Sequence, residues 1–260
     1  MKKKELSPNR IFFLDEVRGF AVACMVFYHA FFLLGGVFGI EAGEKLMNFF
    51  MPVQPLFAAI FILISGISCR LTHNNLRRGI RLLLIAAGFT LVTAYICPLL
   101  GLDGLAIYFG ILHFLSVSML IFSALRKLLD KTEPHWGLLL CVFLYAFTAG
   151  ISEGTLSFGN LIVFNLPDAL YNYKFLAPLG IYSPTFSSAD YFPLFPNIFI
   201  FLAGSFLGVW AKEGKFPSSL YASRCPFFGA IGRKALVIYV IHQPLIFAVV
   251  YVIELIINKF

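Results

Sequence analysis

Seven long stretches of this sequence contain no Asp, Glu, Lys or Arg, and they constrain the fold more than any other feature. They cover residues 19–40, 46–69, 82–102, 104–125, 136–152, 191–211 and 235–253. Because a helix rises about 1.5 Å per residue, each stretch is long enough, or nearly so, to cross the hydrocarbon of a bilayer. With 60% hydrophobic and 13% charged residues, the chain has the composition of an integral membrane protein. We expect an all-α bundle of about seven transmembrane helices, forming a single domain over residues 1–260.

An eighth uncharged stretch, residues 154–167, is shorter and contains two asparagines. Its length favours an interfacial or re-entrant segment, with an eighth span as the alternative. It belongs to the longest region outside the predicted spans, at about residues 153–190. Such a long loop either caps a site on the outer face or is a plain connector.

The basic residues are sorted between the two ends of the predicted spans. With a cytoplasmic amino terminus, all of the 20 Lys and Arg except Lys45, Lys174 and Lys259 fall in segments 1–18, 70–81, 126–135 and 212–234. The acidic residues divide about evenly, which is the positive-inside pattern of a protein in the cytoplasmic (inner) membrane. The net charge of +7 therefore reflects topology, and we expect no nucleic-acid partner.

The five cysteines form no CxxC pair, and no spacing typical of a zinc or haem site occurs. Four of them lie in or at the ends of apolar stretches, where a cysteine behaves as a small hydrophobic residue. We expect no metal in this protein.

The first predicted span carries an acid, a base and an imidazole, in the stretch LDEVRGFAVACMVFYH. Arg18 and His29 are eleven positions apart, which on a helix is about 20° beyond three full turns and about 16.5 Å along the axis. Asp15 lies three residues before Arg18, close enough to pair with it. One helix face thus carries Asp15 and Arg18 at the cytoplasmic end and His29 near mid-membrane. Arg18 is either functional or an interfacial anchor, and His29 is either functional or a partner in helix packing.

Two further histidines, His113 and His242, are predicted at a similar depth in the fourth and seventh spans. Chance scatter is the alternative to a shared polar cavity, which we expect between the first, fourth and seventh spans. Pro244 loosens the helix just after His242, and Gln243 adds an amide at the same place.

Cytoplasmic arginines form the remaining cluster. Arg70, Arg77, Arg78 and Arg81 surround one predicted loop, and Arg233 precedes the seventh span. They serve either topology and anionic lipid head groups, or the phosphates of a long anionic carrier, because arginine matches phosphate oxygens.

The stretch quoted above, with its arginine, ten further residues and a histidine, resembles the opening motif of transmembrane acyltransferases. The chain most resembles the catalytic-domain family of heparan-alpha-glucosaminide N-acetyltransferase, in its bacterial branch. The supporting stretches are FILISGISCRL, FGILHFLSVSMLI, DYFPLFPNIFIFLAGSFLGVW and GRKALVIYVIHQPLI.

The resemblance implies transfer of an acetyl or short acyl group from cytoplasmic acetyl-CoA, across the membrane, to an amine or hydroxyl of a carbohydrate-like acceptor. It implies a catalytic or acetyl-handling role for His29, with Arg18 and Asp15 orienting the donor or the helix. The five arginines named above become candidate sites for the donor phosphates. The other polar positions that the resemblance covers, and that we take as acceptor-site candidates, are His113, Asp190, His242 and Gln243.

A histidine suits this chemistry because it can take the proton of an acceptor and return one to the thiolate leaving group. It can equally form a transient acetyl-imidazole. Two other classes of function stay open, namely a small-solute or proton-coupled transporter and a non-catalytic membrane scaffold, since intramembrane histidines also suit proton relays.

Overall fold

The computed structural model describes residues 10–257, apart from the side chains of residues 37 and 254–257. Residues 1–9 and Lys259, which contribute to the predicted charge asymmetry, lie outside the described residues. The chain forms two compact units. The first joins the chain up to Ile64 with the chain from Phe216 onward, and the second runs from Ser65 to Lys215. Each is described by itself.

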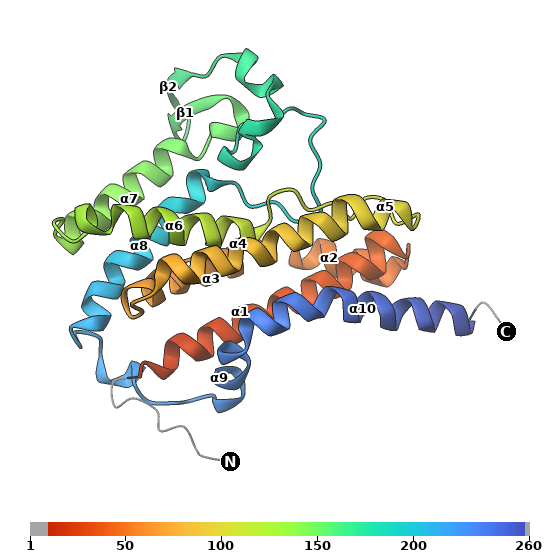
Figure 1. Cartoon of the computed structure of the whole chain (residues 1–260), viewed down its shortest axis with the longest axis horizontal. Coiled ribbons are helices and arrows are strands. Elements are labelled where there is room, and N and C mark those ends of the chain that lie inside the picture. The colour runs from red at the N-terminus through yellow and green to blue at the C-terminus, as the bar shows by residue number, and fades with distance from the viewer. Residues whose placement is uncertain (1–9, 258–260) are drawn as a thin grey trace. The chain divides into compact units, whose positions relative to one another are not determined.

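The first unit is built around α1 (Phe12–Phe32), which packs against α9 (Pro226–Arg233) and α10 (Ala235–Ile257) (Figure 1). A π-helical turn, η1 (Leu33–Val37), leads from α1 to α2 (Glu41–Phe50). The helix α3 (Gln54–Arg70) begins in this unit and ends in the second. A short 3-10 turn, η6 (Ser218–Leu220), precedes α9.

The second unit packs α4 against α6 and α7 against α8. Its core contains the fully buried rings of Phe114, Phe122 and Phe201. Its helices are α4 (Asn75–Thr90), η2 (Leu91–Ile96), α5 (Cys97–Leu99), α6 (Ile111–Leu129), α7 (Pro134–Thr148) and α8 (Leu194–Lys212). Between α7 and α8 lie η3 (Ile151–Glu153), β1 (Thr155–Phe158), β2 (Leu161–Asn165), η4 (Asp168–Asn172) and η5 (Lys174–Leu179).

The predicted transmembrane bundle is confirmed. Within the described residues, 6 helical segments are long and apolar enough to cross a membrane. The pair α2 and α3 makes up to 7 if it counts as one span, although it is bent by 57°. Each of the seven uncharged stretches corresponds to one of these segments, because runs without charge are the strongest signal of a membrane helix.

The first helix begins earlier than its uncharged stretch, which starts at residue 19. Asp15, Glu16 and Arg18 are already part of α1. They are accommodated there because each carboxylate is hydrogen-bonded, and Arg18 pairs with Asp15. Charges that are paired cost less to keep at the end of a membrane helix than isolated ones.

The short stretch at residues 154–167 forms an antiparallel hairpin in place of an eighth helix. Figure 1 shows β1 and β2 beyond the end of α7. The segment is therefore not a helical span, in keeping with the interfacial interpretation.

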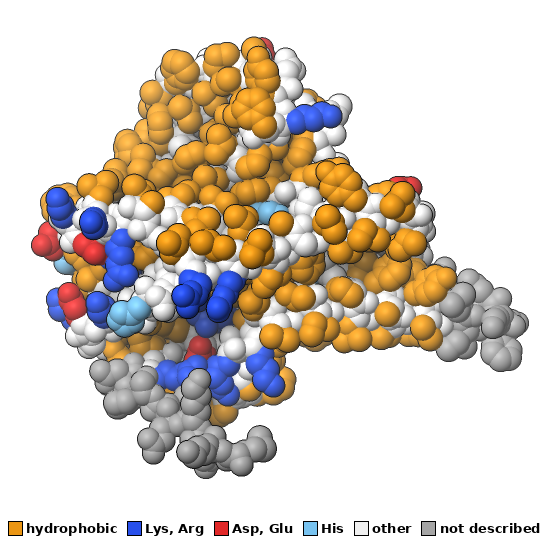
Figure 2. Space-filling model, in the orientation of Figure 1, with side chains coloured by type: hydrophobic (Ala, Val, Ile, Leu, Met, Phe, Trp, Pro, Cys, Tyr) orange, Lys and Arg blue, Asp and Glu red, His pale blue; other side chains and the backbone are white. Residues whose placement is uncertain are grey.

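The surface of the second unit separates apolar from charged side chains. Hydrophobic side chains cover α7 and the hairpin, whereas charged ones gather where α6 ends and α7 begins (Figure 2). Exposed apolar residues on α4 and α7 include Leu84, Leu139 and Phe143. A soluble monomer rarely exposes so large an apolar surface, so lipid is its expected neighbour.

Candidate active site

The carboxylate of Asp15 lies between two arginines at the start of α1. Arg10 donates to Asp15 Oδ2 through Nη2 at 2.6 Å and through Nε at 2.8 Å. Arg18 Nη1 donates to Asp15 Oδ1 at 3.2 Å, which confirms the predicted pairing. Arg10 was not among the candidate residues predicted from the sequence. Two cations on one carboxylate leave an excess positive charge at this end of the helix.

The neighbouring acid, Glu16, holds the segment that leads into α9. Its Oε1 accepts hydrogen bonds from Ser223 Oγ at 2.7 Å and from the backbone N–H groups of Arg224 and Cys225 at 2.9 Å each. Glu16 is buried. Glu16 was not among the candidates predicted from the sequence, although an acid at the start of an apolar span was the available signal.

Two glycines bring the backbones of α1 and α9 into contact. A β-carbon at Gly19 would collide with the carbonyl of Phe228, and one at Gly232 would collide with the carbonyl of Asp15. Small residues allow such close approach between membrane helices. This packing fixes the place of Arg233, which is exposed at the end of α9.

Farther along α1, His29 meets two polar residues of α10. Gln243 Nε2 lies 3.0 Å from His29 Nδ1, and the rings of His29 and His242 have centroids 5.1 Å apart. His242 is buried and His29 half-buried. These three candidate residues thus form one cluster in the first unit. His29 is more than 200 positions away in the sequence from His242 and Gln243.

The hydrogen-bond partners of the two imidazoles indicate that the rings carry their proton on different nitrogens. An amide nitrogen donates, so His29 Nδ1 accepts from Gln243 and the proton of the neutral ring lies on Nε2. The carbonyl of Tyr239 accepts, so His242 Nδ1 donates to it at 2.7 Å and Nε2 keeps a lone pair. That Nε2 is buried and has no hydrogen-bond partner among the described residues. The cluster therefore offers one N–H donor beside one free basic nitrogen.

The third intramembrane histidine, His113, lies in the second unit, and both of its ring nitrogens are occupied. The backbone N–H of Gly110 donates to Nδ1 at 3.2 Å, and Nε2 lies 3.1 Å from Thr90 Oγ1. Thr90 donates its own proton to the carbonyl of Ile107, so it accepts from His113. His113 thus ties the start of α6 to α4. The predicted cavity shared by all three histidines stays a prediction.

Asp190 lies at the same helix start. Its Oδ2 accepts from the backbone N–H of Ile111 at 3.0 Å. A β-carbon at Gly110 would collide with this carboxylate, so the glycine leaves room for it. A carboxylate at a helix N-terminus is favourable because it satisfies an otherwise unpaired N–H group. Asp190 therefore anchors the loop before α8 to α6.

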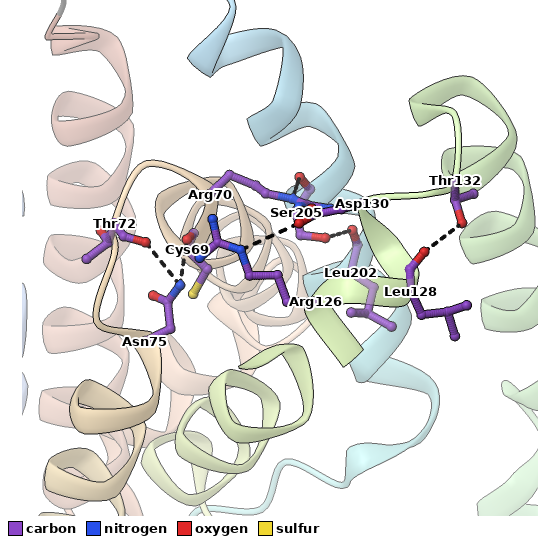
Figure 3. A network of polar contacts seen from close by, with 10 residues as sticks. All are labelled: Cys69, Arg70, Thr72, Asn75, Arg126, Leu128, Asp130, Thr132, Leu202 and Ser205. Carbon is purple, nitrogen blue, oxygen red and sulfur yellow. Dashed lines mark hydrogen bonds and ion pairs between the residues drawn. The ribbon is translucent and has the colours of Figure 1, made fainter. Parts of the chain in front are cut away.

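Among the predicted phosphate ligands, Arg70 is largely committed to the protein itself (Figure 3). It is buried, its Nε donates to the carbonyl of Ser205 at 3.0 Å, and its Nη1 pairs with Asp130. Nearby, Asn75 Nδ2 donates to the carbonyls of Cys69 and Thr72 at 2.7 and 3.2 Å. The bonds of Arg70 fasten the end of α3 to α6 and α8, and those of Asn75 hold the start of α4 against the end of α3.

The other three arginines of this group lie on the first turns of α4. Arg77 and Arg81 are exposed, whereas Arg78 is half-buried, and its Nη1 has no hydrogen-bond partner among the described residues. Of the five predicted phosphate ligands, these three and Arg233 are therefore less engaged with the protein than Arg70 is. Their predicted contact with the donor stays a prediction. For metals, no group of three or more His, Cys, Asp or Glu within residues 10–257 could hold an ion.

Comparison with known protein families decides the relationship. The family described as heparan-alpha-glucosaminide N-acetyltransferase, catalytic, matches residues 10–244, which is most of the chain. The chain belongs to this family. No curated protein and no solved structure matches it.

Membership of the heparan-alpha-glucosaminide N-acetyltransferase catalytic family confirms the resemblance seen in the sequence. It identifies the chain, at the level of the family, as a membrane acetyltransferase. The matched range includes Arg10 and reaches just past Gln243, so every candidate residue named above lies inside it.

Proposed function

We propose that this protein transfers an acetyl group from cytoplasmic acetyl-CoA, across the membrane, to an amine or hydroxyl of a carbohydrate-like acceptor. The observation that carries the proposal is the cluster of His29, His242 and Gln243, within a chain of an acetyltransferase family. A polar cluster inside apolar helices is costly to maintain, and in membrane proteins it usually marks a functional site.

In the proposed reaction, His242 handles the proton. Its Nε2 takes a proton from the acceptor as the acceptor oxygen or nitrogen attacks the thioester carbon. The carbon–sulfur bond then breaks, and the same proton passes to the departing thiolate. The carbonyl of Tyr239 supports both states, because it keeps His242 Nδ1–H hydrogen-bonded while Nε2 changes its protonation.

His29 acts in the proposal on the negative charge that develops on the thioester oxygen. With Nδ1 held by Gln243, its Nε2–H is a positioned donor. Such a donor stabilises a tetrahedral oxyanion, an effect worth about 10²–10³ in rate. Gln243 is then a positioning residue, since it acts through His29.

The charged groups supply donor binding in this proposal. In the first unit, the exposed Arg233 is the group proposed to meet the CoA phosphates, and Arg18 is held by its ion pair with Asp15. In the second unit, the exposed Arg77 and Arg81 stay candidates for the same role. Asp190 and His113 support the acceptor side indirectly, because they hold the start of α6 and the loop before α8.

Reconstituted vesicles test the proposal. Purified protein is given labelled acetyl-CoA with glucosamine, which carries an amine, or with glucose, which carries hydroxyls alone. We expect release of CoA thiol that depends on an acceptor, and labelled sugar as the product. Absence of thiol release, together with sugar flux that needs no CoA, would instead establish a transporter.

A scaffold without catalysis is distinguished by ligand-dependent stability. Acetyl-CoA at 100 times its dissociation constant should stabilise the folded protein by about 2.7 kcal/mol, whereas a scaffold that does not bind it gains nothing. Mass spectrometry during turnover separates the two chemical routes. Direct transfer leaves the protein mass unchanged, and an acetyl-imidazole adds one acetyl group.

A further inference from the structure

The second unit contains a polar cleft that the acetyl-transfer proposal does not use. Its volume is about 540 Å³, and it lies where α6 ends, α7 begins and α8 ends. The charge asymmetry of the sequence predicts that this end of the three helices faces the cytoplasm. The volume falls in the range of small-molecule binding sites.

The lining of the cleft carries an excess of two positive charges, from five basic and three acidic side chains. The two acids Asp130 and Glu213 are already paired, with Arg70 and Lys215 respectively. Lys131 and Lys212 also line the cleft, and neither makes an ion pair within the described part of the chain. Two cationic groups are therefore available to a ligand.

A buried arginine provides a second, independent sign of a ligand. Arg70 lines the cleft and is 6% exposed. Its Nε and Nη1 are bonded to Ser205 and Asp130, but its Nη2 is buried without a hydrogen-bond partner among the described residues. A charged donor left unsatisfied in a buried place is costly, so a ligand acceptor there would restore the lost bond. Figure 3 shows this guanidinium between α3, α6 and α8.

The cleft also has planar side chains. The rings of Trp210 and His135 both line it, with centroids 4.9 Å apart. Nucleic-acid bases and other planar rings stack on aromatic side chains with a gain of about 1–3 kcal/mol per base. Cationic groups for a phosphate thus lie beside surfaces for a ring.

From this combination we propose that the cleft binds a nucleotide, with its phosphates near Lys131, Lys212 and Arg70 and its base against Trp210 and His135. The head of the CoA donor and a free nucleotide share this chemistry. Binding of the CoA head would move the donor phosphates from the arginines proposed above to this cleft, whereas a free nucleotide would be an additional ligand. The inference goes beyond acetyl transfer, and binding can be measured with no turnover. It therefore stands or falls separately from the roles of His29 and His242.

The chain offers a built-in reporter, because its two tryptophans are Trp136 and Trp210. Trp136 is exposed and does not line the cleft. The substitution Trp136→Phe leaves Trp210 as the sole tryptophan. The probes for this protein in neutral-lipid nanodiscs are adenosine 3′,5′-bisphosphate, which is the CoA head, and ADP. We expect a saturable change of Trp210 fluorescence with at least one of them. The probe that binds more tightly shows whether the natural ligand is the CoA head or a free nucleotide.

Charge variants in this single-tryptophan background locate the binding. Lys131→Gln or Lys212→Gln should weaken nucleotide binding about tenfold, the effect of losing about 1.4 kcal/mol. Glu133→Gln should strengthen it several-fold, because this acid also lines the cleft and makes no ion pair within residues 10–257. Lys127→Gln is the matched control, since Lys127 is exposed on α6 but is not part of the lining.

Two results would overturn the proposal. One is the absence of a saturable change with either nucleotide while acetyl-CoA still supports transfer. The other is a response to anionic lipid in the nanodisc that neither nucleotide reproduces or displaces, which would make the cleft a site for lipid head groups.

Discussion

His113 and His242 are both buried histidines in apolar helices, one in each unit, and they differ in what their ring nitrogens contact. Both nitrogens of His113 are engaged, by Gly110 and by Thr90. His242 uses Nδ1 on Tyr239 and leaves Nε2 without a partner among the described residues. An imidazole with both nitrogens hydrogen-bonded holds helices together, whereas one with a buried nitrogen that has no partner can exchange a proton. The comparison separates a structural from a chemical histidine.

Removing the free nitrogen should give the largest effect. In His242→Asn, the side-chain amide can still donate to the carbonyl of Tyr239, but no basic nitrogen remains where Nε2 was. We expect the rate of acetyl transfer to fall by about 10²–10⁴, the range of general acid–base catalysis. The thermal stability should change little. Full activity in this variant would show that His242 is not the base.

His29→Ala should follow, with a loss of about 10²–10³ in turnover, because the proposed donor to the oxyanion is removed. Steady-state measurement of thiol release gives the rate. The variant must insert and fold, which the stabilisation by acetyl-CoA described under the proposed function can verify. A decrease confined to apparent acetyl-CoA affinity, with normal turnover at saturation, would argue against a role in the chemical step.

Gln243→Leu should lower turnover by about tenfold, because His29 loses the hydrogen bond that holds its ring and its tautomer. The effect is expected on turnover and not on stability. Gln243→Asn is the matched control, because it keeps the amide but its side chain is one methylene too short to reach His29 Nδ1. Equal activity of the leucine variant and wild type would remove Gln243 from the mechanism.

The smallest effect on rate is expected at His113, where substitution should lower stability and leave turnover nearly unchanged. His113→Ala should lower the free energy of unfolding by about 1–3 kcal/mol, since the N–H of Gly110 loses its acceptor. Turnover per folded molecule should remain within about threefold of wild type. Unfolding in detergent and thiol release measure the two quantities. A catalytic defect as large as that of His29→Ala would abolish the distinction.

The fold could be predicted largely from the distribution of charge. Long uncharged stretches identified the membrane helices, because an unpaired charge in hydrocarbon is costly. Spacing placed Asp15 and Arg18 on the helix of the first span, but the partners that hold this charged start could not be predicted. They are Arg10, which pairs with Asp15, and the backbone donors of residues 224 and 225, which bind Glu16. The hairpin at residues 155–165 was likewise missed, because a short apolar run fits a strand or a helix equally well.

The candidate site was predictable in part. Spacing indicated that His29 and Arg18 share α1 and that His242 lies at a similar depth, but not that α1 and α10 bring His29 against Gln243. Residue type alone could not separate His113 from His242, or the buried Arg70 from the exposed Arg77. These differences arise from tertiary partners that are remote in sequence.

The most direct test of the account is a double-mutant cycle on acetyl transfer with His29→Ala, His242→Asn and the combined variant. Residues that serve one chemical step act as a unit, so their losses do not multiply. We predict that the combined variant is no more than about twofold slower than the slower single variant. Losses that multiply fully, as for two independent sites, would contradict the claim that these two imidazoles form one catalytic pair.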